Sequence, residues 1–395
     1  MKAVMPLSGS VVDSQDLKPG EGAGKQPLSG EFIAQLVRPD IAGLEEYTPI
    51  APFEVLSARL GFAPERITKL DANENPYGPS PKALKAIADF PYKHIYPDPG
   101  QTLLRDGLEK YLGIDKEHIL CGNGSDELLD LILRLVIEPG DAVINCPPTF
   151  GMYTFLAGVC GARVVEVPRR ADFAVDVEAI AAQFDQRPTK GRIKVIFICR
   201  PNNPDGSMVC EADLHRLLQL PALIVVDEAY IEFSGESIAP WVLDYPNLVV
   251  LRTFSKWAGL AGLRIGYGLF PLPLMKHLWK IKQPYNINVA AQAAALASLD
   301  DVDYLLRNVQ RIVAERERLY RLLHTVAYLQ PYPSHSNFIL CRVVGRSAHD
   351  LKRNLEQRGV LLRYYNKPGL DDCIRVSVGT PEQTDVLMDV LQNLR

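Results

Sequence analysis

Seven short apolar runs lie in the middle of the chain, between about residues 80 and 285. They are rich in Val and Ile and nearly continuous in hydrophobicity, which is typical of strands that are covered on both faces. Helical patterns separate the runs, so we predict an α/β fold with helices on both faces of one sheet. The runs are HILCG (118–122), DAVINCP (141–147), ARVVEVP (162–168), IKVIFIC (193–199), ALIVVDE (222–228), NLVVLR (247–252) and RIGYGLF (264–270).

The pattern changes after about residue 300. A long amphipathic segment (301–326) predicts a helix, and the shorter patterns that follow it predict a separate α+β domain. These patterns are a strand SNFILCRV (336–343), a helix SAHDLKRNLEQRG (347–359), a strand CIRVSVG (373–379) and a last helix from Pro381. We expect four regions: an N-terminal tail or arm (1–44), a segment that packs with the small domain (45–79), a large domain (80–290) and a small C-terminal domain (291–395).

The first stretch of the chain, residues 1–30, is poor in aromatic residues and rich in Gly, Ser, Pro, Lys and Asp. Such a composition cannot bury enough apolar surface to fold, so we expect a mobile tail. The interpretation of this stretch as a transit peptide is weak, because it has no arginine and does contain acidic residues.

Charge and composition disfavour several classes of function. A net charge of −4 gives no reason to expect nucleic acid or an acidic membrane as a partner, and no apolar run approaches the ~18 residues of a membrane helix. The seven cysteines and seven histidines form no CxxC or HxxxH pair, so we expect no bound metal. Scattered cysteines indicate reduced thiols, and we expect a cytoplasmic location.

Polar residues lie at or just after the ends of five of the apolar runs. Ligands of open α/β sheets bind outside the carboxyl ends of the strands, so we expect these residues to meet on one rim. The segments are 123–127 (NGSDE), 148–150 (PTF), 200–204 (RPNNP), 227–230 (DEAY) and 255–256 (SK).

One side of this rim has the residues of a covalent site. Lys256 lies in TFSKWAGLAGLRIGYG (253–268), a small-residue run that offers its ammonium group little water. Partial burial lowers the pKa of a lysine from about 10.4 and makes it a better nucleophile. Asp227 ends a strongly apolar run, so its carboxylate needs a cationic partner. Tyr230 and Asn203 can donate hydrogen bonds to a single oxygen.

The other side of the rim suits a phosphate group. A helix that begins near Gly124 and Ser125 presents unpaired N–H groups and a partial positive charge, and Ser255 and Arg264 could complete the seat. Phe150 could lie flat on an aromatic ring. Pyridoxal phosphate (PLP) has a phosphate, a ring nitrogen, a phenolic oxygen and an aldehyde, and it would use every one of these groups.

Each residue also has an ordinary structural interpretation. Most lysines are solvated, Asp227 could cap a helix, Ser125 could be a plain N-cap, and the PNNPDG run (201–206) could simply make turns. Two other classes of protein fit part of the pattern. A PLP-fold binding protein without turnover is disfavoured by the intact Lys256. A nucleotide-binding dehydrogenase should show G-x-G-x-x-G, and GNGSDE (122–127) has no third glycine at the right place.

Taken together and in order, the motifs of the chain resemble the class I/II aminotransferases of PLP fold type I. Within that class the resemblance is closer to the histidinol-phosphate aminotransferase family, and it covers roughly residues 45–395. The motifs are LDANENPYGPSP (70–81), YPDP (96–99), GSDELLDLILR (124–134), CPPTFGMY (146–153), PNNPDGS (201–207), DEAYIEF (227–233), TFSKWAGLAGLRIGY (253–267) and IRVSVGTPEQ (374–383).

The resemblance implies a fold, an assembly and a reaction. The fold would be a large domain with a mostly parallel seven-stranded sheet and a smaller α+β domain. The enzyme would be a homodimer with shared active sites that transfers an amino group between L-histidinol phosphate and 2-oxoglutarate in L-histidine biosynthesis, with glutamate as the other product. An aromatic-amino-acid aminotransferase and a threonine-phosphate decarboxylase of similar sequence remain as alternatives.

The resemblance also assigns roles around the cofactor. Lys256 matches the lysine that binds the cofactor's aldehyde, and Asp227 matches the carboxylate that keeps the ring nitrogen protonated. Tyr230 and Asn203 match residues on the ring oxygen, and Asn203 lies on the substrate side as well. The residues that match the phosphate seat are Ser125, Asp126, Ser255 and Arg264.

A further group of residues is expected to stack on the cofactor or to bind the substrate. Phe150 stands where the family has an aromatic residue, often Tyr, on the cofactor ring. Tyr96 matches a tyrosine that reaches the cofactor phosphate of the neighbouring subunit. Arg375 matches the arginine that grips the substrate's carboxylate, and Arg363 matches a second arginine on the substrate side. Tyr47 resembles an N-terminal tyrosine that closes over the substrate.

Overall fold

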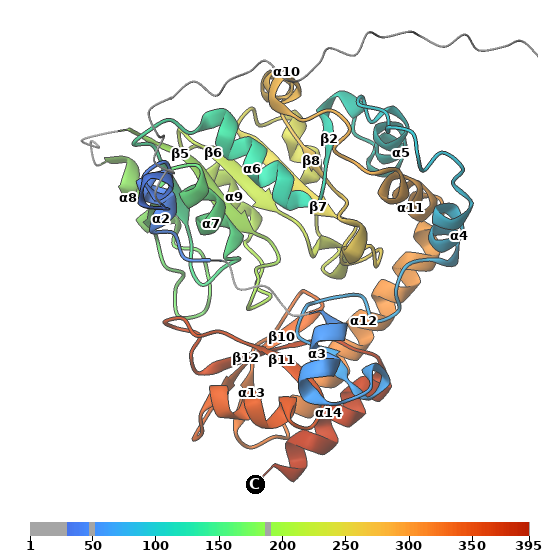
Figure 1. The fold of residues 1–395 in the computed structure, drawn as a ribbon. Helices are drawn as coiled ribbons and strands as arrows, with labels where there is room; N and C mark the ends of the chain where they lie inside the picture. Colours follow the sequence, from blue (N-terminus) through green and yellow to red (C-terminus); the bar gives the residue numbers. More distant parts are fainter. Residues whose placement is uncertain (1–29, 47–51, 186–190, 395) are drawn as a thin grey trace, which may run out of the picture. The chain divides into compact units, whose positions relative to one another are not determined.

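The computed structural model describes most of the chain, in two compact units, Met1–Gly43 and Leu44–Arg395. In the first unit the described residues form two short helices, α1 (Gly30–Ala34) and α2 (Pro39–Ala42). The tail expected at the N-terminus falls almost wholly outside the described part of the chain. The described residues are 30–46, 52–185 and 191–394 (Figure 1).

The second unit contains a seven-stranded sheet with the order β2-β8-β7-β6-β5-β3-β4. Each of the seven predicted apolar runs forms one of its strands. Strand β8 runs antiparallel to both of its neighbours and the other neighbouring pairs are parallel, so the sheet is mostly parallel, as expected. The strands are β2 (Ile119–Gly122), β3 (Ala142–Asn145), β4 (Arg163–Glu166), β5 (Ile193–Cys199), β6 (Leu223–Asp227), β7 (Leu248–Thr253) and β8 (Gly266–Leu269).

Helices cover both faces of this sheet (Figure 1). Neighbouring strand residues point to opposite faces, so Phe197 and Val225 pack in one core whereas Ile198 and Val226 pack in the other. The predicted arrangement of the sheet is therefore confirmed. The core that contains Phe197 includes residues of α6 (Ser125–Val136), α7 (Met152–Val159) and α10 (Leu272–Ile281). The core that contains Ile198 includes residues of α4 (Pro81–Asp89), α5 (Thr102–Leu112), α8 (Val177–Asp185), α9 (Glu211–Leu217) and α11 (Val289–Leu299).

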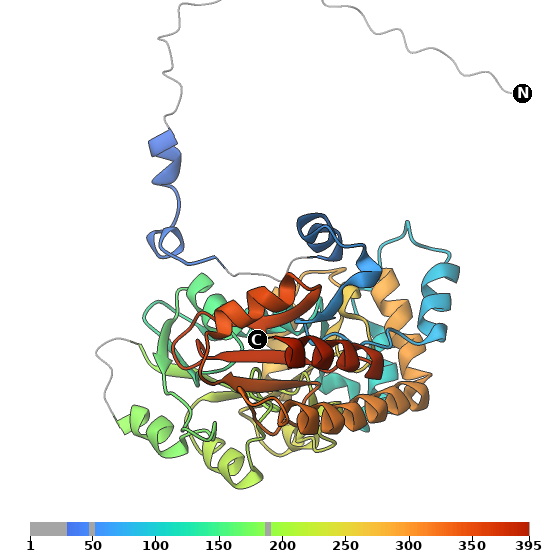
Figure 2. The same cartoon turned by 90° about the horizontal axis from the view of Figure 1, so that it is seen from below.

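A second sheet of five strands has the order β1-β11-β12-β10-β9. Strand β1 is parallel to β11, although the two are far apart in the sequence, and the other pairs are antiparallel. The long predicted helix and the elements that follow it are confirmed, and Figure 2 shows the C-terminal helices beside this sheet. The elements are β1 (Thr68–Leu70), β9 (Leu329–Pro331), β10 (Phe338–Val343), β11 (Val360–Tyr364), β12 (Cys373–Ser377), α3 (Phe53–Leu60), α12 (Val302–Leu323), α13 (Ala348–Glu356) and α14 (Pro381–Asn393).

The start of α6 is set by a glycine. Gly124 is the N-cap and has a φ of 78°, in the left-handed region that glycine adopts without strain. Ser125 is the first helical residue, so its interpretation as a plain N-cap is wrong. A Cβ atom at position 124 would collide with the Arg264 guanidinium, so the glycine also permits the close approach of the loop after β7.

Candidate active site

Two adjoining cavities lie at the carboxyl ends of the strands in the seven-stranded sheet, with volumes of about 350 Å³ and about 130 Å³. Phe150, Asn203, Tyr230 and Lys256 line both of them. The rim predicted from the strand ends therefore exists. The smaller cavity is also lined by the predicted residues Ser125, Asp126, Asp227, Ser255 and Arg264, and the larger one by Arg363 and Arg375.

The phosphate-seat residues surround the first turn of α6. Arg264 donates from Nη2 to Asp126 Oδ2 at 2.8 Å, and its φ of 52° turns the chain back toward that helix. Gly266 lies so close that a Cβ there would be 2.6 Å from the backbone nitrogen of Ser125. A helix N-terminus with a guanidinium beside it is a favourable seat for an anion.

Lys256 lies between the two cavities. Its Nζ donates to the carbonyl oxygen of Ala72 at 3.3 Å and is 5.7 Å from the centre of the Tyr230 ring. Burial, reinforced by the positive charge of Arg375, lowers the pKa of Lys256 to about 8. Near neutral pH a substantial fraction of such an amine is unprotonated, which is the form that acts as a nucleophile or a base.

Asp227 ends β6 inside the smaller cavity and is only 3% exposed. The Tyr153 hydroxyl donates to Oδ2 at 2.7 Å and the Ala229 backbone N–H donates to Oδ1 at 3.0 Å. Burial raises the pKa of Asp227 to about 6, and the hydrogen bond from Tyr153 opposes that shift. Among the residues that the structure describes, no basic side chain pairs with this carboxylate, so the cation expected beside it has to come from a ligand.

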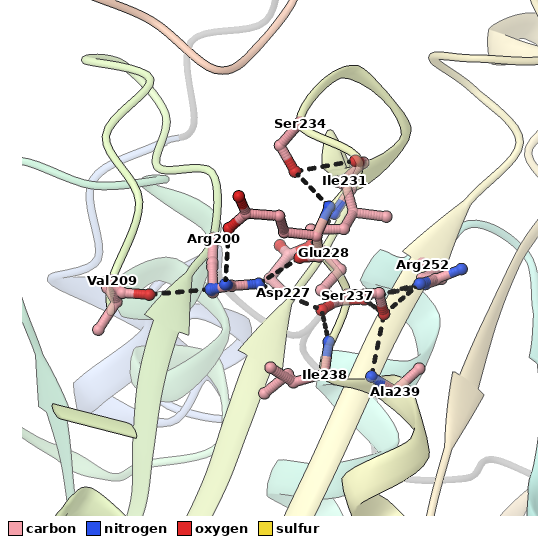
Figure 3. Close-up of polar contacts among 12 residues, drawn as sticks. Arg200, Val209, Asp227, Glu228, Ile231, Ser234, Ser237, Ile238, Ala239 and Arg252 are labelled. Carbon is pink, nitrogen blue, oxygen red and sulfur yellow. Dashed lines mark hydrogen bonds and ion pairs between the residues drawn. The ribbon is translucent and has the colours of Figure 1, made fainter. Parts of the chain in front are cut away.

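The next residue, Glu228, points to the opposite face of the sheet and is fully buried (Figure 3). It accepts hydrogen bonds from Ser237 Oγ at 2.7 Å, from the Ile238 N–H at 2.8 Å and from Arg252 Nε at 3.0 Å. A second guanidinium, that of Arg200, lies 3.9 Å away. This network joins residues at the ends of β5, β6 and β7, and it fixes the strand end that presents Asp227.

Arg375 on β12 faces the larger cavity. It donates to Asn203 Oδ1 at 2.6 Å and to the carbonyl oxygen of Asp71 at 2.8 Å. Its Nε is buried, since the residue is only 5% exposed, and it has no hydrogen-bond partner among the described residues. Arg363 lies directly opposite it on the neighbouring strand β11, so both guanidinium groups can reach one anion.

The Tyr230 hydroxyl lies within reach of two amide groups. Asn73 Nδ2 donates to it at 3.1 Å, and Asn203 Nδ2 lies at 3.5 Å. Burial raises the pKa of Tyr230 above its usual range, so the phenol keeps its proton. Asn73 was not predicted as a site residue. Its motif, LDANENPYGPSP, was noticed in the sequence, but nothing in it showed which of its residues would point inward.

Two predicted residues are not found at these cavities. Tyr96 is 80% exposed and stacks on Tyr285, with ring centres 4.8 Å apart, so it does not lie in the site of its own chain. Tyr47 lies outside the described residues. Sequence reasoning also missed several residues that line the larger cavity, which are Asn73, Asn145, Thr154, Glu166, Tyr365 and Lys367.

The described residues also bear on metal binding and on membrane spanning. Within the described ranges, no three His, Cys, Asp or Glu side chains gather in a way that could hold a metal ion. None of the described helices is long and apolar enough to cross a membrane.

Comparison with known proteins supplies the family context of this geometry. The family described as aminotransferase class I and II matches residues 65–391. A histidinol-phosphate aminotransferase of Roseiflexus castenholzii is 55% identical and aligns over 92% of this chain and 99% of its own, and histidinol-phosphate aminotransferase 1, chloroplastic, of Arabidopsis thaliana is 53% identical over 90% and 85%.

A solved structure shows the same architecture. The histidinol-phosphate aminotransferase of Sinorhizobium meliloti, in complex with pyridoxal-5'-phosphate, superposes with a TM-score of 0.80 at 30% identity and covers 91% of this chain and 98% of its own. This chain thus shares its architecture with a protein whose structure was solved with pyridoxal-5'-phosphate bound.

Proposed function

Because the chain belongs to the class I and II aminotransferases, we propose that it transfers an amino group between L-histidinol phosphate and 2-oxoglutarate with PLP as cofactor. The similarity of this chain to solved aminotransferase structures confirms the expected fold, PLP-dependent fold type I. The substrate proposal is supported by relatives of that name at more than 50% identity over about nine-tenths of the chain. This reaction would belong to L-histidine biosynthesis.

The residues of the smaller cavity fit PLP. Asp227 is a buried carboxylate without a cationic partner among the described residues, and a protonated ring nitrogen would supply one. The first turn of α6 with Arg264 suits the phosphate, and Lys256 suits the aldehyde. When bound, PLP supplies an aldehyde that takes up the amino group and a ring that accepts electrons.

The chain's own residues then have separate tasks. Lys256, with its pKa lowered to about 8, is placed to take a proton from the substrate carbon and return it. Asp227 would hold a cationic ring nitrogen, and Tyr230 with Asn203 would hydrogen-bond the ring oxygen. Phe150 lines both cavities and would pack on the ring face.

The larger cavity supports binding of an anionic substrate. Within the described part of the chain, the buried Nε of Arg375 has no partner, and Arg363 lies opposite Arg375 on the neighbouring strand. Histidinol phosphate and glutamate both carry an anion next to the amino-bearing part of the molecule. One pair of arginines can therefore serve both half-reactions, and a phosphate offers more charge to the second arginine than a carboxylate does.

The observation that carries the proposal is the joint placement of Lys256, Asp227 and Arg375 around two adjoining cavities. A single-turnover spectral assay tests it. PLP-loaded protein is mixed separately with histidinol phosphate, phenylalanine, glutamate and threonine phosphate, and both the loss of the cofactor's visible band and any release of CO₂ are followed. We expect histidinol phosphate and glutamate to react. Faster reaction with phenylalanine would favour an aromatic aminotransferase, and release of CO₂ from threonine phosphate would favour the decarboxylase.

A homodimer with shared sites is also proposed, supported by the exposure of the Tyr96–Tyr285 pair. Mixing inactive Lys256→Ala chains with inactive Tyr96→Ala chains should restore activity, because a heterodimer would contain one intact site. Lys256→Ala mixed with Asp227→Asn is the matched control. Those two residues line one cavity of one chain, so the mixture should stay inactive. A cytoplasmic location is proposed as well, and fractionation of the cells checks it.

A further inference from the structure

Tyr153 on α7 lies behind the cavity carboxylate and has no solvent-exposed surface. We infer that Tyr153 is a positioning residue whose hydroxyl keeps Asp227 ionised and oriented toward the cofactor's ring nitrogen, while its ring supports Phe150. This inference rests on the proposed function, in which Asp227 holds that nitrogen.

The hydrogen bonds of Asp227 define its orientation. Tyr153 donates to one carboxylate oxygen at 2.7 Å, and the Ala229 N–H donates to the other at 3.0 Å. The two donors come from different elements, α7 and the segment after β6. A carboxylate held at both oxygens in this way cannot rotate, and each oxygen keeps lone-pair capacity for one more donor.

The ring of Tyr153 links this carboxylate to the aromatic wall of the site. It stacks on Phe197, with ring centres 4.9 Å apart and 5° between the planes. It also meets Phe150 edge to face, with the centres 5.6 Å apart. Since Phe150 lines both cavities, one buried side chain contacts both the residue expected at the ring nitrogen and the residue expected on the ring face.

The electrostatic surroundings show why a phenol is suitable here. Burial is the main cause that raises the pKa of Asp227. The negative charges of Asp126 and Glu228 raise that pKa further, and the hydrogen bond from Tyr153 is the largest effect that lowers it. Burial also raises the pKa of Tyr153 well above its usual range, so its hydroxyl remains a donor. The groups around Asp227 are Asp126 on α6, Tyr153 on α7, Cys199 on β5, Glu228 and Tyr230 after β6, and Lys256 and Arg264 on the cavity wall.

A neutral donor differs from a basic one in its effect on the site. An arginine at this position would lower the pKa of Asp227 but would also neutralise it. A phenol stabilises the ionised carboxylate and leaves its negative charge available to a cationic ligand. Tyr153 therefore prepares Asp227 for a ring nitrogen without competing with it.

The test uses the apoprotein first, because the inference concerns a property of the chain itself. The pKa of Asp227 is measured by NMR of carboxyl-labelled aspartate, with the signal assigned by its loss in Asp227→Asn. In Tyr153→Phe, which keeps the packed ring, we expect that pKa to rise by about one unit, a tenfold change in the proton equilibrium.

Tyr328→Phe is the matched control. The Tyr328 hydroxyl also donates at 2.7 Å, but to the carbonyl oxygen of Leu391, beside the other sheet. This variant should leave the pKa of Asp227 unchanged. An Asp227 pKa in Tyr153→Phe equal to that of the wild type would overturn the inference.

PLP binding provides the second measurement. PLP should bind about fivefold more weakly to Tyr153→Phe than to the wild type near pH 6, and the difference should shrink toward pH 9, where Asp227 is ionised in both proteins. A loss of PLP affinity in Tyr153→Phe that does not vary with pH would show that the hydroxyl is only structural and would overturn the inference.

The outcomes for the two proposals are distinct. If PLP does not bind wild-type protein at Lys256, the proposed function fails. If the wild type binds PLP and reacts, while Tyr153→Phe leaves the Asp227 pKa unchanged, only the present inference fails.

Discussion

Asp227 and Glu228 are consecutive buried acidic residues, yet the structure surrounds them in opposite ways. Glu228 accepts hydrogen bonds from a hydroxyl, a backbone N–H and one arginine, with a second arginine nearby (Figure 3). Among the described residues, Asp227 accepts hydrogen bonds only from a phenol and a backbone N–H, and it lies on the wall of a cavity. Within the described residues, the set of partners around Glu228 is complete, whereas the set around Asp227 has room for a ligand.

The arginines show the same contrast. Arg252 uses its Nε and Nη2 on Glu228, whereas the buried Nε of Arg375 has no hydrogen-bond partner in the part of the chain that the structure describes. The difference teaches that burial alone does not mark a functional group. A buried charge whose partners are complete holds strands together, and a buried charge with an open position is where a ligand has to be expected.

The largest expected effect is on stability, from Glu228→Gln. Removing the charge leaves the buried Arg252 guanidinium without its paired carboxylate and takes from Arg200 one of its two, which should cost about 3–5 kcal/mol of unfolding free energy. Denaturant unfolding of the apoprotein measures it. The control is Glu317→Gln, since the Arg316–Glu317 pair has the same 3.0 Å separation as Arg252–Glu228 but a half-exposed glutamate. Its cost should be within about 1 kcal/mol. Equal costs in the two variants would contradict the comparison.

Asp227→Asn should affect the reaction instead. The protein should fold and bind PLP, but the loss of the negative charge at the ring nitrogen should raise the barrier by at least about 3 kcal/mol, or more than a hundredfold in rate. Single-turnover rates with histidinol phosphate measure this. An Asp227→Asn enzyme with near-normal turnover would mean that this carboxylate, like Glu228, is only structural.

The pH dependence of stability gives a third contrast. The pKa of Asp227 is about 6 in the folded apoprotein and near 3.8 when unfolded, so the folded state holds this proton more tightly. The contribution of Asp227 to the free energy of unfolding should therefore fall as the pH rises from about 4 to about 6, by up to about 3 kcal/mol. Asp227→Asn should lack this loss and should be the more stable protein above pH 6. Identical pH profiles for the two proteins in urea unfolding would argue against an unfavourable buried charge.

The smallest expected effect separates the two substrate-side arginines. Arg375→Ala should damage both half-reactions, because both substrates present an anion there. Arg363→Ala should reduce kcat/KM about tenfold more for histidinol phosphate than for glutamate, since the extra charge is on the phosphate. Steady-state kinetics with each amine donor measures this. Equal losses for the two donors in Arg363→Ala would remove the phosphate argument.

The positions of the main site residues could be predicted from the sequence, because these residues lie near strand ends. Lys256 and Ser125 each come shortly after an apolar run and Asp227 lies at the end of one, and parallel strands bring such positions to one edge of a sheet. The partners of Asp227 and Glu228 could not be predicted in this way. Tyr153 lies on a helix, and its contact with Asp227 depends on how that helix packs on the sheet.

Other residues could not be placed because their neighbours lie far away in the chain. Asn73 reaches Tyr230 across a separation of 157 residues, and only the folded backbone shows that they meet. Tyr96 is exposed in the single chain, so its expected role depends on a second copy and stays a prediction.

The most direct test of the account is to locate the cofactor chemically. PLP-loaded protein is reduced with borohydride, digested, and the labelled peptide is identified by mass spectrometry. Because the pKa of Lys256 is lowered to about 8 and its Nζ lies between the two cavities, the label should be found on Lys256. A label on another lysine, or none at all, would contradict the assignment of this site.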